Sequence, residues 1–133
     1  MRIEPMHRHA EEHVFRLDGE YWTIAYDGQT VRLRDSAGVR YLAALLRRPR
    51  EPVPASELRT AVHEHGPTQR GRRRTALGDR ERDRVAVTKG VASALARIAA
   101  AHPALGAHLE TTIRCGYQCR YSPDPRRPIR WVE

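Results

Sequence analysis

Polar and apolar residues alternate in three short runs near the N-terminus of the chain. The runs are residues 13–17, 20–26 and 29–34. Asp-Gly dipeptides at 18–19 and 27–28 separate them, and this dipeptide tolerates the positive φ angles of tight hairpin turns. Alternation with a period of two is typical of strands that bury one face. We therefore expect an antiparallel β-meander that buries Trp22, Ile24 and Tyr26.

Three later stretches repeat apolar residues every three to four positions, which predicts amphipathic helices. The expected helices are residues 37–48, 55–65 and 80–101. Ser36 suits the N-cap of the first helix, and Pro49 and Pro103 disfavour helical geometry in the residues before them. The first two helices should bury Val39, Tyr41, Leu42, Ala43, Leu45, Leu46, Leu58, Ala61 and Val62. The third and longest should bury Val87, Val91, Ala94, Leu95, Ile98 and Ala101.

The C-terminal third of the chain predicts a short helix and a hairpin. Pro103 can begin a helix that holds Leu105 and Leu109. Residues 111–114 and 118–121 then have the pattern of two strands joined by a tight turn. In the tail that follows, Ile129 and Trp131 alternate in a way that would let them dock along a sheet edge.

These elements fit an α+β domain with a meander, three main helices and a C-terminal hairpin. A chain of 133 residues supports one domain of this kind with a modest core. We place the domain at residues 13–121, between a polar tail at 1–12 and an extended, proline-rich tail at 122–133.

The charge of the chain favours an acidic partner. It holds 24 Lys and Arg residues against 16 Asp and Glu residues, for a formal net charge of +8. Lys89 is the only lysine, and arginine is the better bidentate partner for phosphate and guanine. Residues 66–80 form a glycine-containing basic loop without apolar periodicity, which includes Arg70, Arg72, Arg73 and Arg74.

Two further groups of polar residues belong to predicted elements. On the long helix, the side opposite the apolar stripe mixes cations with small residues: Arg82, Ala86, Lys89, Ser93 and Arg97. On the predicted hairpin, the polar positions are Arg114, Gln118 and Arg120. A basic helix with small neighbours suits entry into a DNA groove, but an ordinary solvated helix has the same pattern.

The order of elements resembles the winged helix-turn-helix output domain of OmpR/PhoB-type transcription regulators. Residues 28–33 are similar to the strand before its first helix, 41–58 to its first helix and turn, and 112–117 to its wing strand and Gly-Tyr turn. The resemblance covers roughly residues 20–121. It implies a DNA-binding fold in which the long helix enters the major groove and the hairpin forms the wing.

A closer resemblance is to an uncharacterised module at the C-terminus of large actinobacterial and myxobacterial ATPase, cyclase and repeat proteins. It is carried by residues 19–23, 31–35, 84–89, 102–109 and 123–125. The chain departs from that module at residues 66–80, where the module usually has a long charged helical segment. This resemblance implies no catalytic residues.

No arrangement in the sequence predicts an enzyme, a cofactor or a metal site. Cys115 and Cys119 supply two of the four ligands that zinc needs. Across a tight hairpin their sulfurs could also meet in a disulfide, although two reduced cysteines are the simpler expectation. The sequence contains no signal peptide and no stretch with the length and apolarity of a membrane span, so we expect a cytoplasmic protein.

Two functions fit these observations. The first is a transcription regulator that binds double-stranded DNA through Arg82, Lys89, Ser93 and Arg97 on the long helix, the three hairpin residues and the basic loop. The second is a winged helix that binds a protein partner, such as a second copy of the chain, without binding DNA. An exposed apolar patch around Trp22 or Trp131 would favour the second.

Overall fold

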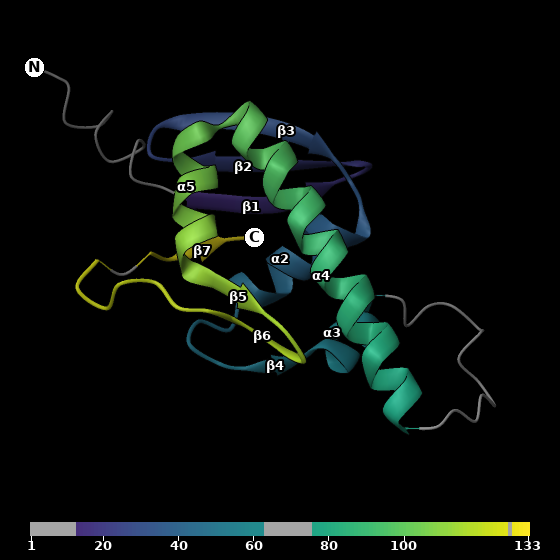
Figure 1. Cartoon of the computed structure of the whole chain (residues 1–133). Helices are drawn as coiled ribbons and strands as arrows, with labels where there is room; N and C mark the ends of the chain where they lie inside the picture. Colours follow the sequence, from purple (N-terminus) through teal and green to yellow (C-terminus); the bar gives the residue numbers. More distant parts are fainter. Residues whose placement is uncertain (1–12, 63–75, 128) are drawn as a thin grey trace, which may run out of the picture.

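The computed structural model describes residues 13–62, 76–127 and 129–133, which form an α+β structure. Its N-terminal part is an antiparallel meander of three strands: β1 (His13–Asp18), β2 (Tyr21–Tyr26) and β3 (Gln29–Arg34). A short strand near the C-terminus, β7 (Trp131–Val132), pairs in parallel with β1 and completes a sheet of order β3-β2-β1-β7. The predicted meander is confirmed, and so is the docking of the tail at a sheet edge (Figure 1).

The helices of the described residues lie on one face of this sheet (Figure 1). They are α2 (Ala37–Leu46), α3 (Ala55–Val62), α4 (Ala76–Ala101) and α5 (Pro103–Thr112). The long helix α4 packs against the other three. It therefore carries most of the contacts that hold the helical layer together.

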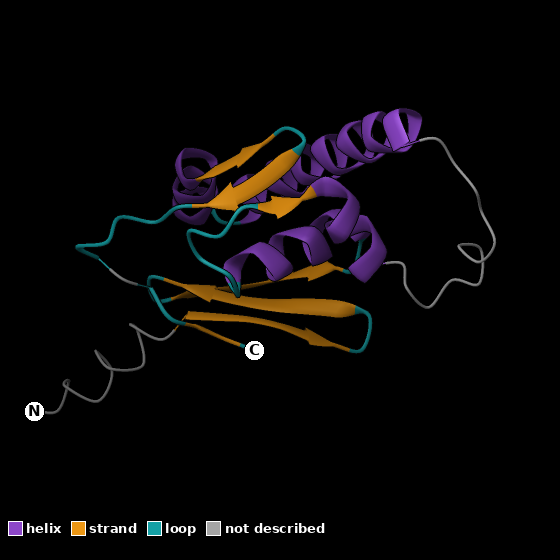
Figure 2. Ribbon diagram, turned by 90° about the horizontal axis from the view of Figure 1, so that it is seen from below, coloured by secondary structure: helices purple, strands orange, loops and turns teal. Residues whose placement is uncertain are grey.

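A second, smaller sheet lies on the opposite side of α2 and α3 (Figure 2). It consists of β4 (Val53–Pro54), β5 (Ile113–Cys115) and β6 (Gln118–Tyr121), in the order β4-β6-β5. The predicted C-terminal hairpin is thus present as β5–β6. The sequence did not predict the third strand, β4, which pairs with β6.

Three of the element boundaries that differ from the sequence expectation belong to helices. The first helix ends at Leu46, two residues early, and Arg47 is its C-cap. The helix α4 begins at Ala76, so the last part of the expected loop 66–80 is helical. The helix α5 continues to Thr112, where a strand was expected. The hydroxyls of Thr111 and Thr112 donate to the carbonyls of Ala107 and His108 one turn earlier.

The core lies between the main sheet and the helices and follows the predicted faces closely. All the predicted inward residues of α2 are buried, as are Val87, Val91, Ala94 and Ile98 on α4. Five residues that were expected to be buried are not fully buried. Four are only partly buried, namely Tyr26, Val62, Leu95 and Ala101, and Ala61 is exposed. In α3 only Ala55 and Leu58 are buried. The short helix α3 therefore buries fewer of its apolar residues than the sequence pattern suggests.

The helices α2 and α4 approach each other at two glycines. A Cβ atom placed on Gly38 would lie 2.1 Å from the carbonyl oxygen of Gly90, and a Cβ on Gly90 would meet the ring of Tyr41 at 3.1 Å. A larger side chain at Gly38 would push the two helices apart, whereas one at Gly90 would require the ring of Tyr41 to shift slightly. The contact sets the distance between α4 and the rest of the core.

Replacing Gly38 with Ala tests this contact. Alanine favours a helix over glycine by about 1 kcal/mol, so helix propensity alone predicts stabilisation. We expect instead that Gly38→Ala lowers the free energy of unfolding by about 1–3 kcal/mol, because the two helices must separate. Urea denaturation measures the change. Gly116→Ala is the control, since a Cβ there meets nothing within 4 Å, and a stabilised Gly38→Ala protein would contradict the packing described.

Candidate nucleic-acid interface

The hairpin places its predicted polar residues on one exposed face. Burial alternates along β6, with Cys119 and Tyr121 buried and Gln118 and Arg120 exposed. Arg114 on β5 is exposed as well and is the direct cross-strand partner of Arg120. The structure therefore brings together the three hairpin residues that the sequence suggested.

These three side chains line a groove of about 450 Å³, here called the hairpin groove. Its remaining lining residues are Pro52, Thr111, Thr112 and Ser122. Within the described part of the chain, neither Arg114 nor Arg120 forms an ion pair. Like charges directly opposite each other on paired strands repel. The hairpin groove thus combines two uncompensated cations with hydroxyl and amide groups, which suits an anion.

A second cavity, the tip cleft, lies where the end of the hairpin meets α3 and α4. It has a volume of about 480 Å³ and is lined by Pro54, Ala55, Ser56, Arg80, Tyr117 and Gln118. The carbonyl of Tyr117 accepts a hydrogen bond of 2.9 Å from the amide of Ala55. The hairpin tip is therefore attached to the start of α3 through its backbone.

The side chain of Tyr117 attaches the same tip to α4. Its hydroxyl donates to Glu81 over 2.8 Å, and the guanidinium carbons of Arg80 and Arg84 lie 5.3 and 5.5 Å from its ring centroid. Hydrogen bonds from Arg84 and then from Tyr117 lower the pKa of Glu81 to about 2. Arg84 is neutralised by Glu81, whereas Arg80 forms no ion pair with another described residue. Sequence analysis did not identify Arg80 or Tyr117, because their contact depends on the fold.

The outer side of α4 keeps most of its predicted residues exposed. Arg82, Lys89 and Ser93 are exposed, and Ala86 is partly buried. The side chains of Arg82, Lys89 and Ser93 form no hydrogen bond or ion pair with another described residue. These three side chains remain available to a partner.

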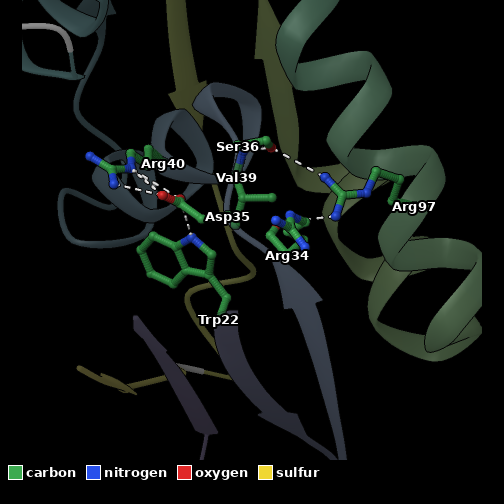
Figure 3. Close-up of polar contacts among 7 residues, drawn as sticks. All are labelled: Trp22, Arg34, Asp35, Ser36, Val39, Arg40 and Arg97. Carbon is green, nitrogen blue, oxygen red and sulfur yellow. Dashed lines mark hydrogen bonds and ion pairs between the residues drawn. The ribbon is translucent and has the colours of Figure 1, made fainter. Parts of the chain in front are cut away.

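Arg97, on the same helix, instead reaches across to Ser36 and Arg34 (Figure 3). Its Nη1 donates to Ser36 Oγ over 3.2 Å, and its Nη2 donates to the carbonyl of Arg34 over 3.0 Å. The guanidinium thus links α4 to the junction between β3 and α2. Helical spacing places Arg97 and Lys89 on the same side of α4. It could not show that only Arg97 bonds to Ser36 and Arg34, because these partners lie far away in the sequence.

Asp35 forms the other half of this junction (Figure 3). Its carboxylate accepts a hydrogen bond of 2.8 Å from Trp22 Nε1 and a bond of 2.6 Å from Arg40 Nη2. Hydrogen bonding from Arg40 is the largest cause of a pKa below the usual value for Asp35, with a smaller contribution from Trp22. Ser36, the next residue, caps α2 by accepting from the amide of Val39, as its position predicted.

The two cysteines are joined in a disulfide across the hairpin. They are cross-strand partners in the β5–β6 register. The simpler expectation of two reduced cysteines is therefore not what the structure shows. The structure shows the disulfide that the sequence left open as an alternative. The turn has the length that places the two cysteines opposite each other.

Histidine side chains near the helix ends have structural partners. His102 is buried and caps α5, with Nδ1 accepting from the amide of Leu105 and Nε2 lying 2.8 Å from the carbonyl of Tyr26. His108 lies 3.0 Å from the hydroxyl of Tyr121. Burial, with a smaller effect of His13, lowers the pKa of His108.

Several sequence predictions fall outside the described residues. The arginines of the basic loop, Arg70, Arg72, Arg73 and Arg74, belong to this group, as does the expected tail 1–12. Within the described ranges, no group of three or more His, Cys, Asp or Glu side chains is arranged to hold a metal ion. None of the helices in these ranges combines the length and the apolarity needed to cross a membrane.

Comparisons with models of known families, with curated proteins and with solved structures found no match to this chain. The assignment of a function therefore depends on the geometry and charges described above.

Replacing Arg97 distinguishes a structural arginine from an exposed cation on the same helix. We expect Arg97→Ala to lower the free energy of unfolding by about 0.5–1.5 kcal/mol, because it removes hydrogen bonds to Ser36 and Arg34. Lys89→Ala is the matched control and should change stability by less than about 0.5 kcal/mol. Thermal or urea denaturation measures both. Equal stability of the two variants would show that Arg97 does not support the junction.

Asp35 gives the junction a defined pH dependence. Its folded pKa is below the unfolded value, so its stabilising contribution is present above the unfolded pKa and is lost as pH falls through the folded pKa. We expect Asp35→Asn to cost about 1–3 kcal/mol at pH 7, and the difference from the original protein to shrink below pH 4. Urea midpoints measured from pH 7 to pH 3 test this. Glu20→Gln, which alters an exposed pair with Arg34, should show almost no difference at either pH.

Proposed function

We propose that this chain is a DNA-binding regulator that uses a winged helix, with α4 as the recognition helix and β5–β6 as the wing. The observation that carries the proposal is the pair Arg114 and Arg120. Two arginines directly opposite each other, exposed and without an acidic partner in the described residues, are stabilised by a bound polyanion. Phosphate groups of a nucleic acid supply regularly spaced charges of this kind.

The order and pairing of the elements support the same proposal. An N-terminal meander precedes α2, β4 and α3, and the β5–β6 hairpin follows α4, as in the resemblance noted from sequence. The strand β4 pairs with β6, so the hairpin is anchored beside the start of α3. The helix α5 stands between α4 and the hairpin, which is an addition to the simplest form of that arrangement.

The exposed residues divide into two roles. Arg114, Gln118 and Arg120 surround a groove with hydroxyl groups and suit contacts with phosphate. Arg82, Lys89 and Ser93 lie on a rigid helix, where the direction of a side chain is defined well enough to distinguish bases. Arg97 is not part of this set, because its guanidinium is held by hydrogen bonds to Ser36 and to the carbonyl of Arg34.

The alternative of a protein-binding module without DNA binding has less support. The sequence would favour it if an apolar patch were exposed around the tryptophans. Trp22 is only 4% exposed and is bonded to Asp35, and Trp131 is partly buried and donates to the hydroxyl of Tyr121. These side chains belong to the packed interior and its margin.

Binding measurements with three variants test the proposed division. We expect Arg114→Ala and Arg120→Ala to weaken binding to all duplexes alike and to reduce the salt slope by about one unit for each phosphate that is no longer bound. Lys89→Ala should cost about 1–3 kcal/mol on a preferred duplex, selected from a random pool, and much less on random DNA. Fluorescence anisotropy at several salt concentrations measures both effects.

A control arginine keeps the test specific. Arg32 is exposed on the outer face of the N-terminal sheet, beside the ring of Tyr21. Arg32→Ala changes net charge by the same amount as Arg114→Ala but should leave duplex binding nearly unchanged. If all three arginine variants lose affinity equally, the binding reflects net charge and not the hairpin groove. If the original protein binds no duplex at low salt, the proposal is wrong.

A further inference from the structure

The disulfide between Cys115 and Cys119 lies in the hairpin that forms the proposed wing, on the side of the strands opposite the exposed Arg114, Gln118 and Arg120. The cross-strand pair Arg114 and Arg120 directly adjoins it on one side, and the tip residues 116–118 adjoin it on the other. Gln118 lines both the hairpin groove and the tip cleft. A change in the state of this bond would therefore act where both cavities meet.

The bond stabilises the whole fold less than a disulfide that closes a long loop would. A disulfide stabilises a protein mainly by restricting the conformations of the unfolded chain, and this effect grows with the length of the closed loop. Here the two cysteines are only four positions apart. The strands are also paired at Ile113 with Tyr121 and at Arg114 with Arg120, and β6 pairs with β4 as well. The main consequence of the bond is therefore local, at the hairpin tip.

The tip holds contacts that depend on its conformation. The amide of Gly116 donates to the carbonyl of Gln118 over 2.9 Å, and the carbonyl of Tyr117 accepts from Ala55. The hydroxyl of Tyr117 reaches Glu81 on α4. The ring of Tyr117 is about half exposed, so little burial opposes its movement. Without the disulfide, only the contacts of tip residues 116–118 would hold the end of the hairpin, and few of these contacts are buried.

We infer that Cys115–Cys119 is a site of thiol–disulfide exchange at which a dithiol reductant loosens the hairpin tip. Loosening the tip also weakens DNA binding, and this second effect rests on the proposed function. The two sulfurs differ in access, because Cys115 is partly buried while Cys119 is fully buried. The reductant therefore attacks at Cys115.

The exchange proceeds in two steps, each of which conserves atoms and electrons. A thiolate of the dithiol attacks Cys115 Sγ, the bond between the cysteines breaks, and its electron pair leaves with Cys119 Sγ, which then takes up a proton. The second thiol of the reductant, as thiolate, attacks the mixed disulfide and releases Cys115, which is protonated in turn. The protein gains two electrons and two protons, and the dithiol becomes a cyclic disulfide.

The reduced protein binds more weakly because its hairpin is less well ordered before the duplex binds. In the oxidised protein, the bond fixes the spacing of the two strands beside Arg114 and Arg120. After reduction, these side chains and Gln118 must be ordered again when a duplex binds, and each immobilised side chain lowers affinity. The N-terminal sheet β1–β3 does not contain the bond, and its pairing remains unchanged.

The test compares the oxidised protein, the protein reduced with dithiothreitol, and the double variant Cys115→Ser with Cys119→Ser. Alkylation followed by mass spectrometry counts the thiols. Amide hydrogen exchange follows Gly116 and Ala55, whose bonds belong to the tip, with strands β1–β3 as the internal control. Fluorescence anisotropy measures duplex affinity in each state.

We expect both cysteines to resist alkylation before reduction and to become alkylated together afterwards, with reversal by an oxidant. Exchange at Gly116 and Ala55 should rise by about tenfold on reduction, while β1–β3 stay protected. Duplex affinity should fall by about threefold to tenfold. The double variant should match the reduced protein and show no response to dithiothreitol.

Different failures point to different errors. Free thiols in the untreated protein, or tip amides whose exchange is the same in both redox states, would overturn the inference. Unequal exchange with equal duplex affinity would overturn the link between the tip and binding. If the tip loosens but neither state binds any duplex, the exchange site stands and the proposed function is wrong.

Discussion

The relative positions of the main sheet, α2 and α4 depend on the junction between β3 and α2, where Asp35 and Ser36 meet three separate elements. The carboxylate of Asp35 accepts from Trp22 in the sheet and from Arg40 in α2. Ser36 caps α2 and accepts from Arg97 in α4. A partly buried carboxylate is more stable with such partners, since leaving it unpaired costs free energy. Sheet, inner helix and long helix are thereby fixed relative to one another.

The local parts of this fold were predictable from sequence. Both Asp-Gly turns, the N-cap at Ser36 and the buried stripe of α4 follow from backbone preferences and periodicity, which act over a few residues. The features that could not be predicted are long-range. The pairing of Val53 with Cys119 and the contact of Tyr117 with Glu81 join positions far apart in the chain. No periodicity within either segment contains that information.

The candidate site shows the same division. The exposed face of the hairpin was predictable, because strand alternation separates Arg114 and Arg120 from the buried Cys119. The different orientation of Arg97 was not, because helical spacing places it on the same side as Lys89 and cannot reveal that a carbonyl group of β3 lies within its reach. The disulfide was left open for a related reason, since two cysteines at this spacing suit both the reduced and the oxidised state.

The approach of Gly38 to Gly90 limits how this surface can adapt. A slip of α4 along α2 by one residue would shift it by about 1.5 Å and would bring a side chain into a space that holds only backbone. The helix is thus held in one register along α2. In the oxidised protein the hairpin is also attached to α4 through Tyr117 and Glu81, so a partner that touches both elements meets them at a defined spacing. For a bound duplex, the adjustment in groove width or curvature would therefore fall on the DNA, and its deformability would contribute to selection.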